Sequence, residues 1–152
     1  RFASPAQDGS ITNTVSATGA GIANEVSDSE LISAESAPQL SILKAMSPTV
    51  VSENGQLTYT LTIQNSGNIA VTAADDVIVA DKFDPILNSI SVTFNGTAWT
   101  EGVNYTYDNA TGQFTTIAGQ ITVPAASFVR DTATGEWTVT PGVSTIVITG
   151  TI

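Results

Sequence analysis

The chain has 152 residues, 41% of them hydrophobic, and its 14 acidic against four basic residues give a formal net charge of −10. This charge repels nucleic acids and anionic membranes, so we expect no nucleic-acid partner and no membrane insertion. The absence of cysteine and histidine excludes disulfides, Cys- or His-based metal sites and histidine-dependent catalysis, and we predict that the protein is not an enzyme.

Residues 1–39 are predicted to form an N-terminal extension. It contains one aromatic residue, Phe2, and two expected short strands, SITNTVSA and GIANEVSD, joined through TGAG. The stretch 29–36 has weak helical signals, and LISA within it is equally compatible with a strand. Alone, this segment buries too little apolar surface to fold, so we expect it to pack on something else.

Residues 40–152 are predicted to form the body of the domain. Apolar residues alternate with period two and turn residues recur every eight to twelve positions. The clearest strand is QLTYTLTIQN, and VIVAD, SISVTF and STIVITGTI follow the same pattern. YDNATGQF and RDTATGEW are expected hairpin tips. This spacing predicts an all-β fold, an immunoglobulin-like antiparallel β-sandwich.

The segment 40–83, LSILKAMSPTVVSENGQLTYTLTIQNSGNIAVTAADDVIVADKF, resembles the bacterial and archaeal surface-repeat family known as DUF11. The shared features are a strand ending in Lys44, Gly55 before a Thr/Tyr strand, the turn NSG, and Asp81 at the end of the next strand. The resemblance implies an immunoglobulin-like sandwich on the outside of a prokaryotic cell, used for scaffolding or adhesion rather than catalysis.

The order of the strands departs from that family. There, a strand like STIVITGTI continues into a last strand resembling ITNTATV, whereas here the ITNT strand lies at residues 11–14. Joining Ile152 to Arg1 would restore the family order. The body is therefore predicted to be an incomplete sandwich with an unpaired edge and an apolar groove, and residues 1–39 to be a strand-donating extension.

The destination of that strand is open. As a donor strand it would enter the groove of the next copy and build an extracellular filament or pilus-like fibre, with the chain's partners being copies of itself. It can also fold back into its own body, or the chain is one tandem stalk repeat of a larger adhesin or S-layer protein. A carbohydrate-binding module using Trp99 is the alternative from another class. The proposed donor strand carries Ile11, Asn13, Val15 and Ala17 on one face.

Three polar side chains, those of Lys44, Asn13 and Asp81, are expected to point inward, because each alternates in phase with the apolar residues of its strand. Together they fit a Lys–Asn isopeptide bond: a neutral Lys44 attacks the amide of Asn13, ammonia leaves, and Asp81 shuttles protons. This resembles the bonds of Gram-positive pilin and adhesin sandwiches. An ordinary Lys44–Asp81 ion pair, with Asn13 capping a backbone group, is the alternative.

No cofactor is predicted. Oxygen-bearing side chains gather in AADDVIVADKFD and YDNATG, as Ca²⁺ sites require, and the weak calcium candidates are Asp75, Asp76, Asp84 and Asp108. The chain contains no twelve-residue calcium-loop pattern, so a solvated acidic rim is the favoured interpretation.

Overall fold

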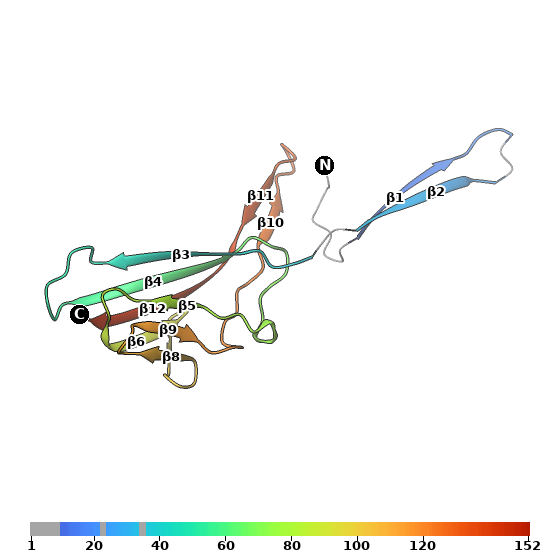
Figure 1. Ribbon diagram of the computed structural model, residues 1–152. Helices are drawn as coiled ribbons and strands as arrows, with labels where there is room; N and C mark the ends of the chain where they lie inside the picture. Colours follow the sequence, from blue (N-terminus) through green and yellow to red (C-terminus); the bar gives the residue numbers. More distant parts are fainter. Residues whose placement is uncertain (1–9, 22–23, 34–35) are drawn as a thin grey trace.

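The computed structural model describes residues 10–21, 24–33 and 36–152, and in this part of the chain it contains β-strands, one 3-10 turn and no α-helix. The predicted all-β sandwich is confirmed (Figure 1). In chain order, the elements are β1 (Ser10–Ala17), β2 (Val26–Ser33), β3 (Leu40–Ser47), β4 (Gln56–Asn65), η1 (Ala73–Asp75), β5 (Ala80–Lys82), β6 (Asn88–Phe94), β7 (Thr97–Trp99), β8 (Tyr105–Asp108), β9 (Gln113–Thr116), β10 (Ser127–Arg130), β11 (Trp137–Thr140) and β12 (Gly142–Thr151).

Two sheets enclose the core of the body, and β10 and β11 form a separate two-stranded sheet. The larger has the order β3-β4-β12-β6-β7 and the smaller the order β5-β9-β8, with every named pairing antiparallel. The strict alternation of β4 explains its position, because one face is buried in the core and the other faces outward. The buried face consists of the four predicted residues, Leu57, Tyr59, Leu61 and Ile63, and of Asn65 at the end of the strand.

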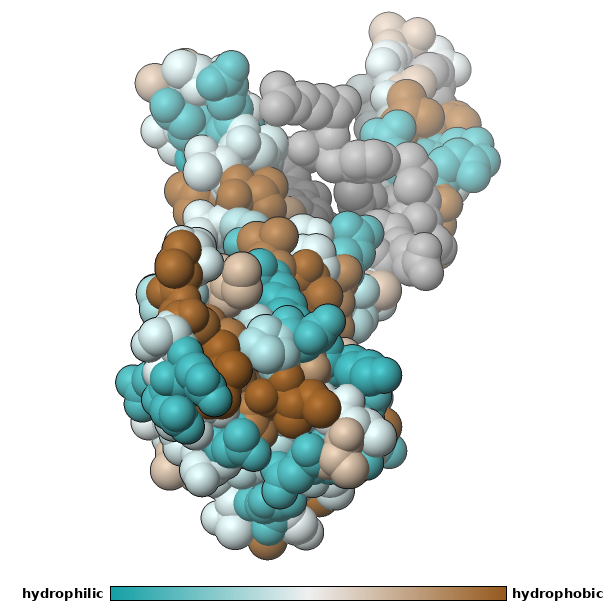
Figure 2. All heavy atoms as spheres, turned by 60° about the vertical axis from the view of Figure 1, so that its left-hand side comes forward, coloured by the Kyte–Doolittle hydropathy of each residue, from teal (hydrophilic) through white to brown (hydrophobic). Residues whose placement is uncertain are grey.

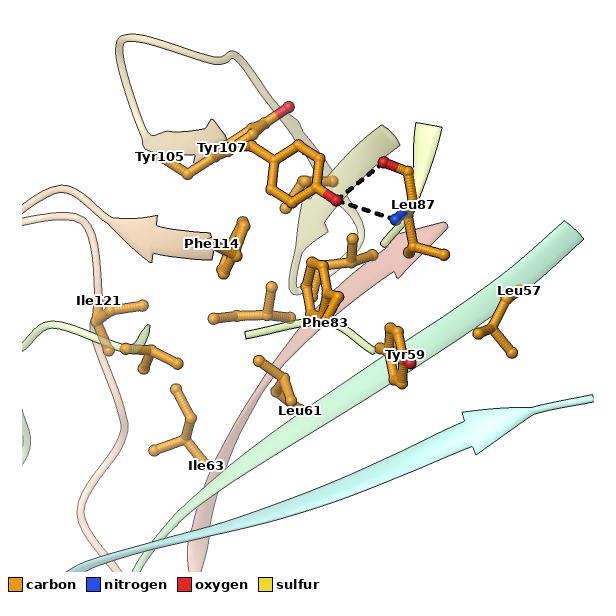
Figure 3. Close-up of a cluster of buried hydrophobic side chains, with 14 of the residues drawn as sticks. Leu57, Tyr59, Leu61, Ile63, Phe83, Leu87, Tyr105, Tyr107, Phe114 and Ile121 are labelled. Carbon is orange, nitrogen blue, oxygen red and sulfur yellow. Dashed lines mark hydrogen bonds between the residues drawn. The ribbon is translucent and has the colours of Figure 1, made fainter. Parts of the chain in front are cut away.

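The core between the sheets is built around aromatic rings (Figure 3). Phe83 stacks on Tyr59 with ring centroids 4.9 Å apart and lies 5.8 Å from Phe114 of the smaller sheet. The buried Tyr107 hydroxyl donates to the Leu87 carbonyl at 2.9 Å and accepts from the Leu87 N–H at 3.0 Å. These contacts join the two sheets without any residue from the N-terminal extension, so the body contains its own core.

In the described part of the N-terminal extension, β1 and β2 form a two-stranded hairpin that points away from the body (Figure 1). Strand β1 occupies the predicted range, but the second strand was predicted too early: β2 spans Val26–Ser33 instead of residues 21–28. The ladder of the hairpin ends with the pairing of Ala17 and Val26, so the described residues 18–21 and 24–25 lie outside it and LIS belongs to β2. Among the described residues, neither strand is paired with a strand of the body.

The predicted strand VIVAD is also shorter in the structure. Only residues from Ala80 onward join a ladder, with β9. Val79 donates its N–H to the Thr116 hydroxyl, while the Thr116 N–H donates to the Val79 carbonyl, both at 2.9 Å. A side chain thus replaces one bond of the regular ladder. Both predicted hairpin tips are confirmed, between β8 and β9 and between β10 and β11.

A clamp of hydrogen bonds holds residues 36–39, which precede β3, against the turn 65–68. The buried Asn65 side chain accepts the N–H groups of Gln39 and Gly67, both at 2.9 Å, and donates to the carbonyls of Ile69 and Pro124. Asn68 accepts from the Ala37 N–H and donates to the Ser36 hydroxyl. A Cβ on Gly67 would lie 2.1 Å from the Ala37 carbonyl oxygen, so glycine is required for this close approach.

We expect Asn65→Ala to lower the free energy of unfolding by about 3 kcal/mol, because it leaves several buried backbone groups without partners. Urea or guanidinium denaturation measures this difference. Gln64→Ala is the matched control on the outward face of β4, and its effect should remain within about 0.5 kcal/mol. Equal effects of the two substitutions would show that the clamp adds nothing to the stability of the body.

Candidate functional site: an open groove and a lysine–aspartate pair

Strand β3 borders an apolar groove on the open side of the sandwich. All eight of its residues are exposed, including the inward-facing Leu40, Ile42 and Met46, at 41%, 52% and 51% exposure. The groove runs between β3 and the segment that leads into β5, and has a volume of about 290 Å³. Hydrophobic side chains gather in strips on the face of the body in Figure 2. The groove is lined by Leu40, Ser41, Ile42, Ile63, Val77, Ile78, Val79 and Ala80.

The groove exists because the two sheets differ in width. The larger has five strands and the smaller has three, so the inward face of β3 has no facing layer. Among the described residues, β3 pairs only with β4 and β5 only with β9, which leaves one edge of each strand free. Leu40 and Ile42 lie by Val77–Ala80, and Lys44 lies by Asp81, so β3 and the segment 77–81 run in the same direction.

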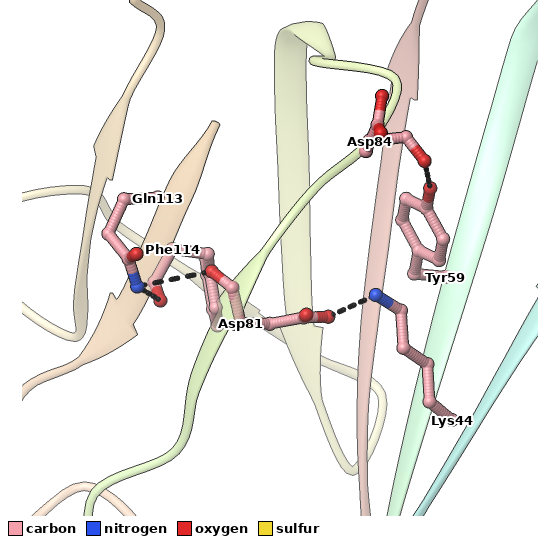
Figure 4. A network of polar contacts seen from close by, with 6 residues as sticks. All are labelled: Lys44, Tyr59, Asp81, Asp84, Gln113 and Phe114. Carbon is pink, nitrogen blue, oxygen red and sulfur yellow. Dashed lines mark hydrogen bonds and ion pairs between the residues drawn. The ribbon is translucent and has the colours of Figure 1, made fainter. Parts of the chain in front are cut away.

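Beside one end of the groove, Lys44 reaches from β3 across the sandwich to Asp81 of β5 (Figure 4). Lys44 Nζ lies 2.7 Å from Asp81 Oδ2, 4.4 Å from the centroid of the Tyr59 ring and 5.5 Å from that of Phe83. Asp81 Oδ2 is buried and makes no aligned hydrogen bond with a described residue, so the charge of the ammonium compensates its burial. The predicted inward direction of both side chains is what brings them together.

The pair is covered unequally. The Lys44 side chain is 40% exposed and that of Asp81 18% exposed, so water still reaches the amine through the open groove. A half-exposed ion pair of this kind contributes at most about 1 kcal/mol to stability. Stability alone is therefore a weak reason for an ion pair beneath the edge strand β3.

Tyr59 forms the floor beneath this pair. Burial, and then the negative charges of Asp81 and Asp84, raise the pKa of its phenol. The phenol therefore stays protonated at neutral pH, and it donates a hydrogen bond to the Asp84 carbonyl at 3.3 Å. Lys44 thus rests on an uncharged aromatic surface, with one carboxylate in contact.

The third predicted residue, Asn13, lies away from this pair, in the exposed hairpin. It sits directly opposite Glu30 of β2, so these two side chains project from the same face of the hairpin. Sequence reasoning missed Glu30 because β2 was expected several residues earlier. Val15 and Ala17 follow Asn13 on the same face and are exposed. The Ile11 backbone pairs with Ile32, while the Ile11 side chain lies outside the described part of the structure.

The weak calcium candidates do not form a cluster. In the described part of the chain, no three His, Cys, Asp or Glu residues are placed to hold a metal ion. Asp75 caps its own turn by accepting from the N–H and hydroxyl of Thr72. Hydrogen bonds from Thr111 and then Ala110 lower the pKa of Asp108, so its oxygens serve the β8–β9 turn. Asp76 is the left-handed residue that ends η1, and Asp84 is exposed.

Trp99, the candidate for a sugar-binding face, stacks on Phe94 with ring centroids 4.9 Å apart and is half-buried at the edge strand β7. One face of the indole is therefore used within the body. The described part of the chain contains no helix long and apolar enough to cross a membrane. Comparison with protein-family models, curated proteins and solved structures gave no match.

Proposed function

We propose that the protein is a structural subunit of an extracellular filament, in which the β1–β2 hairpin of one copy completes the groove of the next. The observation that carries this proposal is the pairing, in one chain, of an uncovered apolar groove with a detached hairpin that exposes Val15 and Val26 on one face. The extracellular location rests on the DUF11-like resemblance. Scaffolding requires no catalytic group.

The widths of the sheets support addition of the whole hairpin. Adding β1 and β2 beyond the free edge of β5 would widen the smaller sheet from three strands to five, equal to the larger sheet. The added strands would then face the inward side chains of β3. Addition to the free edge of β3 would instead widen the sheet that is already larger, and would leave Ile42 and Met46 uncovered.

An antiparallel register between β1 and β5 sets one face of β1 beside the inward side chains of the segment 77–81. With Val15 beside Val79, Ala17 lies beside Val77 and Asn13 beside Asp81, because residue numbers run in opposite directions in such a pair. Val15 and Ala17 then lie over the groove that Leu40 and Ile42 line. The backbone of β1 at the same time satisfies the free edge of β5.

The clamp opposes insertion of the hairpin into its own groove. In the antiparallel register, β2 runs in the same direction as β3, so β2 ends near the end of β3 and far from its start. Ser36, however, is bonded to Asn68 beside the start of β3. The three residue steps from Ser33 to Ser36 span about 11 Å at most, whereas the eight residues of β3 span about 24 Å. A neighbour's hairpin meets no such limit.

Donation of this kind is head-to-tail, since the donor and the groove are different surfaces of one subunit. Such contacts build an open filament unless the rotation between subunits closes a ring. In a tandem stalk repeat the same interface would join neighbouring repeats of one longer polypeptide. Denaturation of a variant that cannot form a bond through Lys44 separates the filament from the tandem repeat. Separate subunits then return to the monomer mass, whereas repeats of one polypeptide do not.

Deletion of residues 1–36 tests the proposal. We expect the truncated protein to remain folded, since the core cluster lies within the body, and to remain monomeric in light scattering while the full chain polymerises. A synthetic peptide of residues 8–36 should bind the truncated protein with 1:1 stoichiometry and raise its melting temperature.

The matched control is the same peptide carrying Val15→Asp, which replaces an apolar contact by a second carboxylate directly opposite Asp28 and should not bind. Polymerisation of the truncated protein, or equal binding of both peptides, would contradict strand donation.

A further inference from the structure

We propose that docking of the hairpin triggers a covalent bond between Lys44 of one subunit and Asn13 of the next, with Asp81 as the proton carrier. The proposal rests on the strand donation proposed above and adds a modification site to it. The product is an isopeptide bond, which would join a chain without cysteine into a covalent polymer.

The nucleophile and the proton carrier are already assembled in the free subunit. Lys44 Nζ and Asp81 Oδ2 are 2.7 Å apart, and the Oδ2 atom is buried. The amine lies over the ring faces of Tyr59 and Phe83. These faces offer no oxygen or nitrogen atom that could replace Asp81 as the hydrogen-bond acceptor. This arrangement holds the amine near one point between the two sheets.

The electrophile arrives with the donor strand. In the register that sets Val15 beside Val79, Asn13 lies beside Asp81, and side chains directly opposite in adjacent strands have Cβ atoms about 5 Å apart. The carboxamide of Asn13 then lies next to the carboxylate that already contacts Lys44 Nζ. The same register therefore fills the apolar groove and completes the reactive set.

Docking also removes the pair from water. In the free subunit the Lys44 side chain is 40% exposed, so solvent reaches the amine. The donated strands would exclude this water, and loss of water favours the neutral forms of an amine and a carboxyl group. Transfer of one proton from Lys44 to Asp81 gives both. The reaction is thus confined to assembled subunits.

The atoms balance without any other reactant. The Nζ lone pair of neutral Lys44 attacks Cγ of Asn13, and a new C–N bond forms. The Asp81 carboxyl group donates its proton to Nδ2 of Asn13 and accepts one from Nζ. The Cγ–Nδ2 bond breaks, and Nδ2 leaves as ammonia. Nothing is oxidised or reduced, and Asp81 returns to its starting state.

Two further carboxylates enter the groove with the donor, because Glu30 lies directly across from Asn13 and Asp28 directly across from Val15 on the same face of the hairpin. We assign the proton transfer to Asp81, since Asp81 already contacts the amine. Glu30→Gln is accordingly the matched carboxyl control for Asp81→Asn.

The test is denaturing electrophoresis and mass spectrometry of the boiled, assembled full chain. We expect a ladder of covalent multimers, a mass deficit of one ammonia per junction, and a proteolytic fragment in which Lys44 is joined to Asn13. Lys44→Arg, Asn13→Ala and Asp81→Asn should each abolish the ladder. Lys82→Arg, which replaces the one other lysine, and Glu30→Gln should retain it.

Electron microscopy of the same samples separates the two proposals. Filaments of Lys44→Arg that dissociate to monomers on boiling, beside wild-type filaments that do not, support the covalent bond. Wild-type filaments that boil to monomers of unmodified mass overturn the bond and leave strand donation standing. A wild-type protein that forms no filament overturns strand donation itself. Ammonia loss within a monomer would place the bond inside one chain, which also overturns the intermolecular assignment.

Discussion

A mixture of the variants Ile42→Asp and Val15→Asp is expected to form dimers and nothing longer, whereas each variant alone stays monomeric. Ile42→Asp damages the groove and leaves the donor hairpin intact; Val15→Asp does the reverse. One productive contact therefore remains in the mixture, from the hairpin of the first variant to the groove of the second. Burial of an unpaired carboxylate costs about 3 kcal/mol or more, which weakens each damaged contact at least about a hundredfold.

Both positions are exposed in the free subunit, so neither substitution should unfold it. The matched controls place the same charge on the opposite face of each strand: Leu43→Asp on β3 and Thr14→Asp on β1, both at exposed positions. These controls should polymerise like the wild type. Light scattering reads out all four variants. Long polymers in the mixture, or polymers of either variant alone, would contradict a head-to-tail contact between this hairpin and this groove.

A circular permutant that places residues 1–36 after Ile152 is expected to be a closed monomer. Strands β3 and β12 are both antiparallel to β4, so β12 ends where β3 ends. In the antiparallel register, β1 would begin at that same end of the body. Residues 1–9 then need only connect Ile152 to the nearby start of β1. Because the hairpin belongs to the same chain as the groove, it competes with the hairpins of other copies at an effective concentration of about millimolar.

The permutant should therefore elute as a monomer at concentrations at which the wild-type chain polymerises, and should melt at a higher temperature than the truncated body. Introducing Val15→Asp into the permutant serves as its control and should cancel that increase. A permutant that still polymerises would show that the position of the hairpin in the chain does not decide between closure and assembly.

The sequence predicted the parts of the fold that depend on local alternation. Strand β4 alternates strictly over ten residues, and its buried face follows directly from that period. The inward direction of Lys44 and Asp81 followed from the same rule, and the structure places the two groups in contact. In these strands no irregularity shifts the alternation between predicted and observed faces.

Other features depend on contacts between distant segments, which periodicity does not contain. The position of β2 is fixed by pairing with β1, so the sequence placed it too early and missed Glu30. Val79 joins β9 through the Thr116 side chain, a contact between residues 37 positions apart. The role of Asn65 was hidden for the same reason, because the NSG turn reads as a loop until its partners at Gln39 and Pro124 are known.

The exposure of β3 also had no local signal. Leu40, Ile42 and Met46 alternate like the core residues of β4, yet they stay uncovered because the smaller sheet ends at β5. Sequence alone indicates that these residues belong in a core. The relative widths of the two sheets determine whether the covering strands come from the body or from elsewhere.

Cryo-electron microscopy of the assembled wild-type chain tests strand donation most directly. We expect density for β1 antiparallel to β5, with Val15 beside Val79, and continuous density from β2 through residues 34–39 into the β3 of an adjacent subunit. Density that connects this hairpin to the β3 of the same body, or a groove left open in the assembly, would contradict the account.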